Sequence, residues 1–162
     1  MKLKEVGTVV KILNKLFVDQ RLKPDKKLSM IRFMRELNTQ LDDIAAINTG
    51  IYTKYALKDK DGKMIKHPFD TKYAYQEIFK DNTKQIILIP ISNRNDNYVI
   101  ELQYTTYKTV HQEAIEFLDK GWTPVSKFSL LTEEAVNYNL SASEIEELMN
   151  LGIVKDLKEV IN

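Results

Sequence analysis

The sequence contains no cysteine, and its five glycines are scattered singly along 162 residues. The lack of cysteine excludes disulfides, zinc–thiolate sites, iron–sulfur clusters and cysteine nucleophiles. Phosphate-binding loops and dinucleotide fingerprints need several glycines at close spacing, and neither occurs; GxSxG and HExxH motifs are also missing. We therefore expect no cofactor, no bound metal, no catalytic residues and no enzymatic activity.

Long apolar runs and a strong net charge are absent as well. The 24 basic and 23 acidic side chains give a net charge of +1, which argues against a strongly basic nucleic-acid binder. No stretch approaches the roughly 18 uninterrupted apolar residues of a membrane span. Lys11, Asn14 and Lys15 interrupt the apolar segment that a secretory signal would need. We expect a cytoplasmic protein without a membrane partner and, from its length, a single domain.

The nearly balanced total hides an uneven distribution of charge. Residues 1–40 carry an excess of basic side chains and residues 121–162 an excess of acidic ones. Two interpretations stay open: solvated or mutually packed faces, or a basic patch that meets an acidic partner. The candidate patch comprises Arg21, Lys23, Lys27, Arg32 and Arg35. Arg32 could grip an anion, but a surface arginine paired with Glu36 at i,i+4 needs no ligand.

The first third of the sequence predicts two helices. Apolar residues at steps of three and four indicate an amphipathic helix over residues 4–20. Pro24 or Asp25 can start a second, longer helix, whose apolar stripe runs through Met30, Met34, Leu37, Leu41, Ile44, Asn48, Ile51 and Tyr55. We expect an antiparallel hairpin over residues 1–58, with the stripe closing within one chain or in a homodimer. Asn48 is the polar exception and either sets pairing register or bonds to nearby backbone.

The motif KDKDGK after the long helix raises the question of a calcium loop. With Gly62 at position six of an EF-hand loop, Leu57 would stand at position one and Pro68 at position twelve, where carboxylates are required. Asp59 and Asp61 alone supply too few oxygens. The Asp61-Gly62 pair instead predicts a turn or small hairpin, because glycine tolerates a positive φ.

Residues 59–162 predict a small, mainly antiparallel sheet with short helices. The expected elements are a short helix capped by Asp70 that includes Ile78 and Phe79, strands at 84–91 and 98–104, a helix at 107–120, a strand at 125–130, a helix from Thr132, a capped helix from Ser141 to Gly152 and a last helix or turn at 155–162. The fold class is therefore α+β.

A second candidate binding surface consists of three tyrosines in one strand-to-helix segment, Tyr98, Tyr104 and Tyr107. Such tyrosines could stack the bases of a single strand, or they could belong to a protein interface or a half-buried sheet face. Because basic residues are not clustered in this half of the chain, we favour the protein interface.

The two histidines lie in unrelated segments. His67, before Pro68, is typical of a turn, and His111 of a helix surface. Glu113 and Glu116 lie three residues apart near His111, which would suit a metal or acid–base site if a further ligand came from elsewhere. An exposed acidic face explains these glutamates equally well.

Several motifs in this order resemble a family of small uncharacterised proteins of tailed phages and prophages of low-GC Gram-positive bacteria. They are Ser29-x-x-Arg32 in KKLSMIRFMREL, a long helix ending in Tyr55-Ala56, the KDKDGK turn, the isoleucine-rich strand and the closing LSASEIEELMNLGIV. The resemblance covers residues 1–91 and about 128–154, so that residues 92–127 look like an insertion. It implies a phage origin and a gene near late structural or lysis genes, and it supplies no catalytic residues.

We therefore expect a phage-encoded, non-enzymatic accessory protein that binds a host or phage protein in the bacterial cytoplasm. It would act in virion or tail assembly, or as an inhibitor of a host or defence protein. The alternative is a nucleic-acid-binding protein that sets the basic patch against phosphates.

Overall fold

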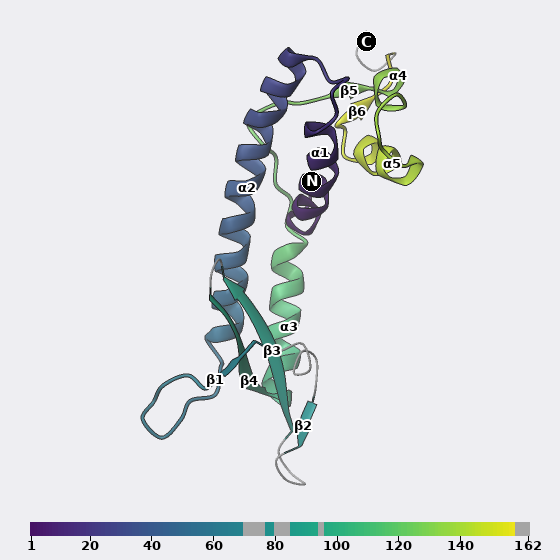
Figure 1. Ribbon diagram of the computed structural model, residues 1–162. Coiled ribbons are helices and arrows are strands. Elements are labelled where there is room, and N and C mark those ends of the chain that lie inside the picture. Colours follow the sequence, from purple (N-terminus) through teal and green to yellow (C-terminus); the bar gives the residue numbers. More distant parts are fainter. Residues whose placement is uncertain (70–76, 80–84, 94–95, 158–162) are drawn as a thin grey trace. The chain divides into compact units, whose positions relative to one another are not determined.

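The fold combines helices with small β-sheets, which confirms the α+β prediction (Figure 1). The computed structural model describes residues 1–69, 77–79, 85–93 and 96–157. The chain forms two compact units: unit 1 comprises Met1–Leu41 and Gly121–Asn162, and unit 2 comprises Asp42–Lys120. The prediction of a single domain, with residues 92–127 as an insertion, stays a prediction.

Unit 1 begins with the expected helical hairpin. A 3₁₀ turn, η1 (Leu3–Glu5), leads into α1 (Val6–Phe17), and α2 (Pro24–Thr53) follows a short connection. The apolar stripes of both helices contain fully buried side chains, namely Val6, Val9, Leu13, Leu16, Met30 and Leu37. Burial of each leucine contributes about 2 kcal/mol to folding. The first part of the α2 stripe is thus satisfied within a single chain, while a homodimer through this helix stays a prediction.

The C-terminal part of unit 1 consists of short elements. They are β5 (Leu130–Leu131), α4 (Thr132–Ala135), α5 (Ala142–Asn150) and β6 (Val154–Lys155), which pairs with β5 in parallel. The capping box at α5 is confirmed, because Ser141 Oγ accepts from the Glu144 amide while the Glu144 carboxylate accepts from the Ser141 amide. Glu144 also bonds Lys15 of α1 at 2.7 Å, and this bond helps to hold the pKa of Glu144 below its usual value.

The strand predicted at residues 125–130 is wrong except at its last residue. Residues 125–129 lie outside the strands, and only Leu130 joins β5. The physical reason is a competing acceptor: the backbone amides of Val125 and Ser126 donate to the carboxylate of Glu36 on α2 instead of to a neighbouring strand. Alternating apolar residues alone do not reveal such a long-range partner.

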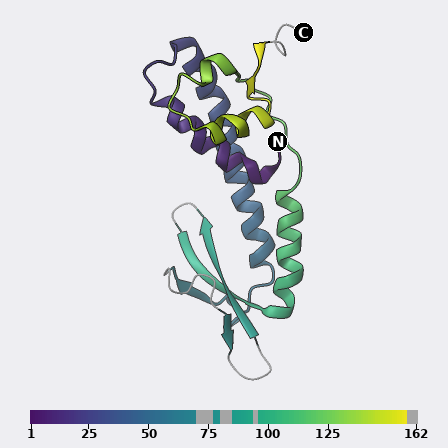
Figure 2. The same cartoon turned by 90° about the vertical axis from the view of Figure 1, so that its right-hand side faces the viewer.

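Unit 2 is built around an antiparallel hairpin. Its strands are β1 (Lys66–Pro68), β2 (Glu77–Phe79), β3 (Gln85–Asn93) and β4 (Asp96–Gln103), in the order β1-β4-β3-β2. Figure 2 shows β3 and β4 as its two long strands. Their register places Ile89 opposite Ile100 and Ile87 opposite Leu102. The buried core of this unit gathers Ala56, Ile91, Ile100, Leu102 and Val110.

The helix expected from Asp70 is wrong where the structure describes it. Ile78 and Phe79 belong to β2, which pairs antiparallel with β3; residues 70–76 lie outside the described residues, as do most of the residues expected in the last helix or turn. The helical spacing of the apolar residues was overridden by tertiary context, because the isoleucine-rich β3 offers a ladder of backbone partners.

Helix α3 (Tyr104–Leu118) begins three residues earlier than predicted, directly after β4. Tyr104 therefore lies on the first turn of the helix and shares a face with Tyr107. The turn after α2 is confirmed: the Asp59 carboxylate accepts from the amides of Asp61 and Lys63, and Gly62 has a φ of 79°. None of the helices formed by the described residues is both long enough and apolar enough to span a membrane.

Gly152 offers a test of the local structure that ends α5. Its φ is 75°, whereas Gly121 in the same unit does not have a positive φ, and both have open space where a Cβ would lie. Gly152→Ala should therefore lower the free energy of unfolding by about 1 kcal/mol, because only the left-handed backbone penalises alanine. Gly121→Ala is the matched control and should cost nothing measurable. Urea unfolding of both variants checks this, and equal effects would contradict it.

Candidate functional site

The structure divides the predicted basic patch into one paired arginine and four unpaired cations. Arg21 donates to both carboxylate oxygens of Asp19, at 3.0 and 2.8 Å, and its guanidinium lies 5.9 Å from the centre of the Tyr138 ring. These hydrogen bonds from Arg21 hold the pKa of Asp19 far below its usual value and raise that of Arg21. Most of the charge of Arg21 is therefore compensated locally.

The other members of the patch lie on or just before α2. Lys23, Arg32 and Arg35 are exposed and Lys27 is half-buried. Within the part of the chain that the structure describes, none of the four makes an ion pair. Arg32 and Arg35 stand at i,i+3, so both project from the same side of the helix. This side also carries Leu28, which is 50% exposed.

Glu36 explains why Arg32 lacks its expected partner. Instead of pairing at i,i+4, the Glu36 carboxylate accepts the backbone amides of Ser126, at 2.8 Å, and Val125. These bonds, that of Ser126 foremost, lower the pKa of Glu36. A carboxylate bound by two amides has little capacity left for a neighbouring arginine. The guanidinium of Arg32 is consequently available to a ligand.

Beside these arginines, α1 and α2 form a shallow groove of about 280 Å³. Its lining comprises Asn14, Phe17, Ile31, Met34, Arg35 and Asn38. Phe17 is 44% exposed. The groove therefore combines apolar walls with a positive charge at Arg35.

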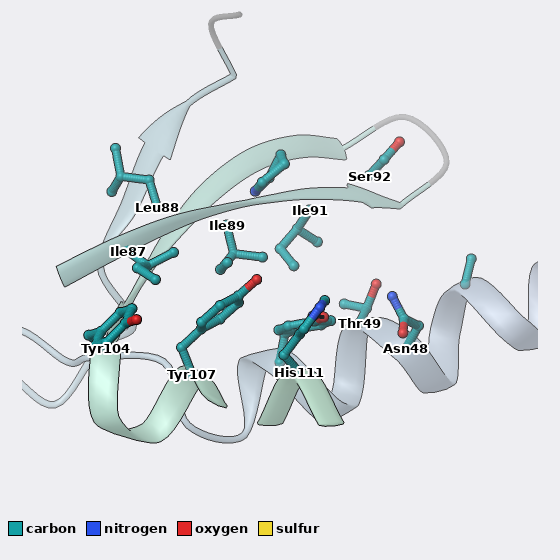
Figure 3. A pocket seen from close by; sticks show the side chains of 13 residues that line it. Asn48, Thr49, Ile87, Leu88, Ile89, Ile91, Ser92, Tyr104, Tyr107 and His111 are labelled. Carbon is teal, nitrogen blue, oxygen red and sulfur yellow. Dashed lines mark hydrogen bonds between the residues drawn. The ribbon is translucent and has the colours of Figure 1, made fainter. Parts of the chain in front are cut away.

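Unit 2 contains a larger pocket, of about 680 Å³, between α2, β3 and α3 (Figure 3). It is lined by Ala45, Asn48, Thr49 and Tyr52 of α2, the β3 residues Ile87–Ser92, and Tyr104, Tyr107 and His111 of α3. Of the three tyrosines proposed from the sequence, Tyr104 and Tyr107 thus meet at one site. Tyr98 lies elsewhere, packed against the unit 2 core with Lys66 4.4 Å from its ring centre.

Aromatic side chains hold the helical side of this pocket in place. The Tyr52 hydroxyl and His111 Nδ1 are 3.0 Å apart and share a hydrogen bond. The rings of Tyr107 and His111 are stacked, with their centres 5.1 Å apart and their planes 20° from parallel. Burial, with a smaller effect of Tyr107, raises the pKa of Tyr52, so its hydroxyl keeps its proton at neutral pH.

Sequence reasoning singled out Asn48 and His111, but for other roles, and it missed Tyr52. The first two carry a sequence signal, since Asn48 interrupts the apolar stripe of α2 and His111 stands four residues after Tyr107 on α3. Tyr52 gave no signal, because only the packing of α3 against α2 reveals its role.

The hypothetical metal site around His111 is not assembled among the described residues, where no three His, Asp or Glu side chains gather as metal ligands. His111 lines the tyrosine pocket, whereas Glu113 and Glu116 line a separate shallow depression with Lys108. The other histidine, His67, was assigned to a turn; it lies in β1 instead and bonds the buried Glu101 carboxylate at 3.1 Å.

Comparisons with family models, curated proteins and solved structures found no match to this chain.

The interaction of Glu36 with residues 125–126 is testable by its pH dependence. Because the folded-state pKa of Glu36 is lowered, its stabilisation is present above the unfolded-state pKa and is lost as the pH falls through the folded-state value. Glu36→Gln should therefore destabilise the protein by about 1 kcal/mol at pH 7, and the difference from wild type should shrink at pH 3. The exposed Glu146→Gln is the matched control; urea unfolding at both pH values measures each, and a pH-independent deficit would contradict the assignment.

Proposed function

We propose that this chain is a non-enzymatic protein-binding accessory protein, encoded by a phage and acting in the cytoplasm of its bacterial host. Its work there is in virion or tail assembly, or in the inhibition of a host or defence protein. The resemblance of the sequence to small proteins of tailed phages supports the phage setting. The groove between α1 and α2 supports the binding role.

The observation that carries this proposal is the juxtaposition of Arg35 with the exposed Phe17 in one groove, with Arg32 on the same side of α2 as Arg35. Glu36 is held by two backbone amides, so the arginines are left for an external carboxylate. A groove with Phe17 and Arg35 in its wall, and Arg32 on the same side of α2, suits an amphipathic helix of the partner. Its apolar anchors would face Ile31 and Met34, and its acidic residues the arginines. Arginine, phenylalanine and methionine are also enriched at protein interfaces relative to the rest of the surface.

The alternative function, nucleic-acid binding through the same patch, has weaker support. Arg21 is paired with Asp19, which removes one cation from the surface that phosphates would meet. Phosphate recognition also makes no use of an apolar groove, whereas protein recognition does. The two functions differ in salt dependence, because contacts to phosphates lose affinity steeply as salt displaces them.

Charge reversal on α2 tests the proposal. Arg32→Glu with Arg35→Glu should weaken capture of a specific protein from nuclease-treated host lysate at least about tenfold, since the groove would then repel an acidic helix. Lys60→Glu with Lys63→Glu makes the same change in charge on the exposed turn of unit 2 and should leave capture intact.

A photo-crosslinker at Asn38, which lines the groove, locates the contact. It should attach to the captured protein, while the same crosslinker at Lys60 should not. Phe17→Ser should reduce capture without any change in charge. The protein-binding proposal would be overturned if capture survived the reversal of the two arginines. It would also be overturned if the captured material disappeared with nuclease, and that result would favour nucleic-acid binding.

A further inference from the structure

The pocket of unit 2 has a chemical character of its own. None of the side chains lining it carries a fixed charge. Burying an unpaired charge there would cost several kcal/mol. The part of any ligand that enters the pocket is therefore uncharged.

The two sides of the pocket favour a flat ligand. Ile87, Ile89 and Ile91 point from β3 toward the helices, and the rings of Tyr104 and Tyr107 lie opposite them (Figure 3). Aliphatic side chains on one side and aromatic rings on the other bury both faces of a planar molecule. The volume of about 680 Å³ lies within the range of pockets that hold small molecules.

Asn48 supplies the polar recognition. Its side chain points from α2 toward the strands (Figure 3), and its Oδ1 is buried without a hydrogen-bond partner in the described part of the chain. Leaving such an acceptor unsatisfied costs about 1–3 kcal/mol. A half-turn about the Cβ–Cγ bond exchanges the amide oxygen and nitrogen, so the amide can present either an acceptor or a donor to a ligand.

We propose that this pocket binds an uncharged, planar heteroaromatic molecule whose edge carries hydrogen-bonding groups, such as a nucleobase or a nucleoside. The ring lies between the isoleucines of β3 and the aromatic side chains of α3, and its polar edge bonds to Asn48. An asparagine amide is a common hydrogen-bond partner of such edges, as it is of adenine. Tyr52 and His111 hold each other and fix the helical side of the pocket.

The two histidines provide the measurement, because the imidazole C–H signals of His67 and His111 are separable in a proton NMR spectrum. Adenosine and uridine are titrated to millimolar concentration against the full chain. At least one of them should move the His111 signal saturably and leave that of His67, which bonds Glu101 away from the pocket, in place. Cyclohexanol, which is neutral but not planar, and benzoate, which is planar but charged, should bind at least about tenfold more weakly.

Variants separate binding from folding. Asn48→Ala should weaken nucleoside binding about tenfold by removing the polar contact, whereas Gln112→Ala, on the exposed surface of α3, should have no effect. Ile89→Phe fills the pocket and should abolish binding, and an unchanged His67 signal reports that unit 2 is folded in each variant. The proposal is overturned if neither nucleoside moves His111 saturably, if both histidines respond alike, or if Asn48→Ala and Ile89→Phe bind as wild type does.

Discussion

Both candidate sites depend on α2, a single helix whose sequence changes character along its length. In unit 1 its buried face presents Met30 and Leu37, and the edge of that face supplies Ile31, Met34 and Arg35 to the groove. In unit 2 the same helix supplies Asn48, Thr49 and Tyr52 to the tyrosine pocket. An α-helix fixes the direction of every side chain to within a few tens of degrees. One element thus contributes residues to two chemically different surfaces, one in each unit.

The electrostatics of unit 1 follow from where the backbone of residues 125–126 places its amides. Two unpaired amides need an acceptor, and the Glu36 carboxylate satisfies both. Had Glu36 paired with Arg32, the surface of α2 around these residues would have been closer to neutral. Such an exposed ion pair adds little to stability, because water screens the attraction. Because the two backbone amides bind Glu36, the positive charges of Arg32 and Arg35 on the surface of α2 are not compensated by it. The contrast is Arg21, which the adjacent Asp19 compensates.

The sequence predicted those elements whose cause is local. The periodicity of α1 and α2, the Asp-Gly turn and the Ser141 capping box all rest on residues within one or two helical turns, and all are confirmed. The failures share a different cause. The strand expected at 125–130 lost its amides to Glu36, and the helix expected at Ile78–Phe79 became a strand beside β3. In each case a partner distant in sequence decided the outcome, and spacing within a window cannot reveal such a partner. For the same reason the sequence did not reveal the role of Tyr52 of α2, which shares a hydrogen bond with His111 of α3.

Asn48 combines a local sequence signal with a tertiary environment that the sequence alone does not reveal. The spacing of the apolar stripe of α2 predicts an apolar residue at this position. Instead, the Oδ1 atom of Asn48 is buried there without a hydrogen-bond partner among the described residues. A leucine would fill part of the pocket and remove an unsatisfied acceptor, so on grounds of stability alone it would be the better residue. Departures from a local rule that lower stability concentrate at functional sites. This departure lies on the wall of an uncharged pocket flanked by aromatic rings, so ligand binding gives it a direct physical explanation. Met30, Met34 and Leu37, which precede Asn48 in the stripe, are already buried in a single chain, so that part of the stripe needs no second copy.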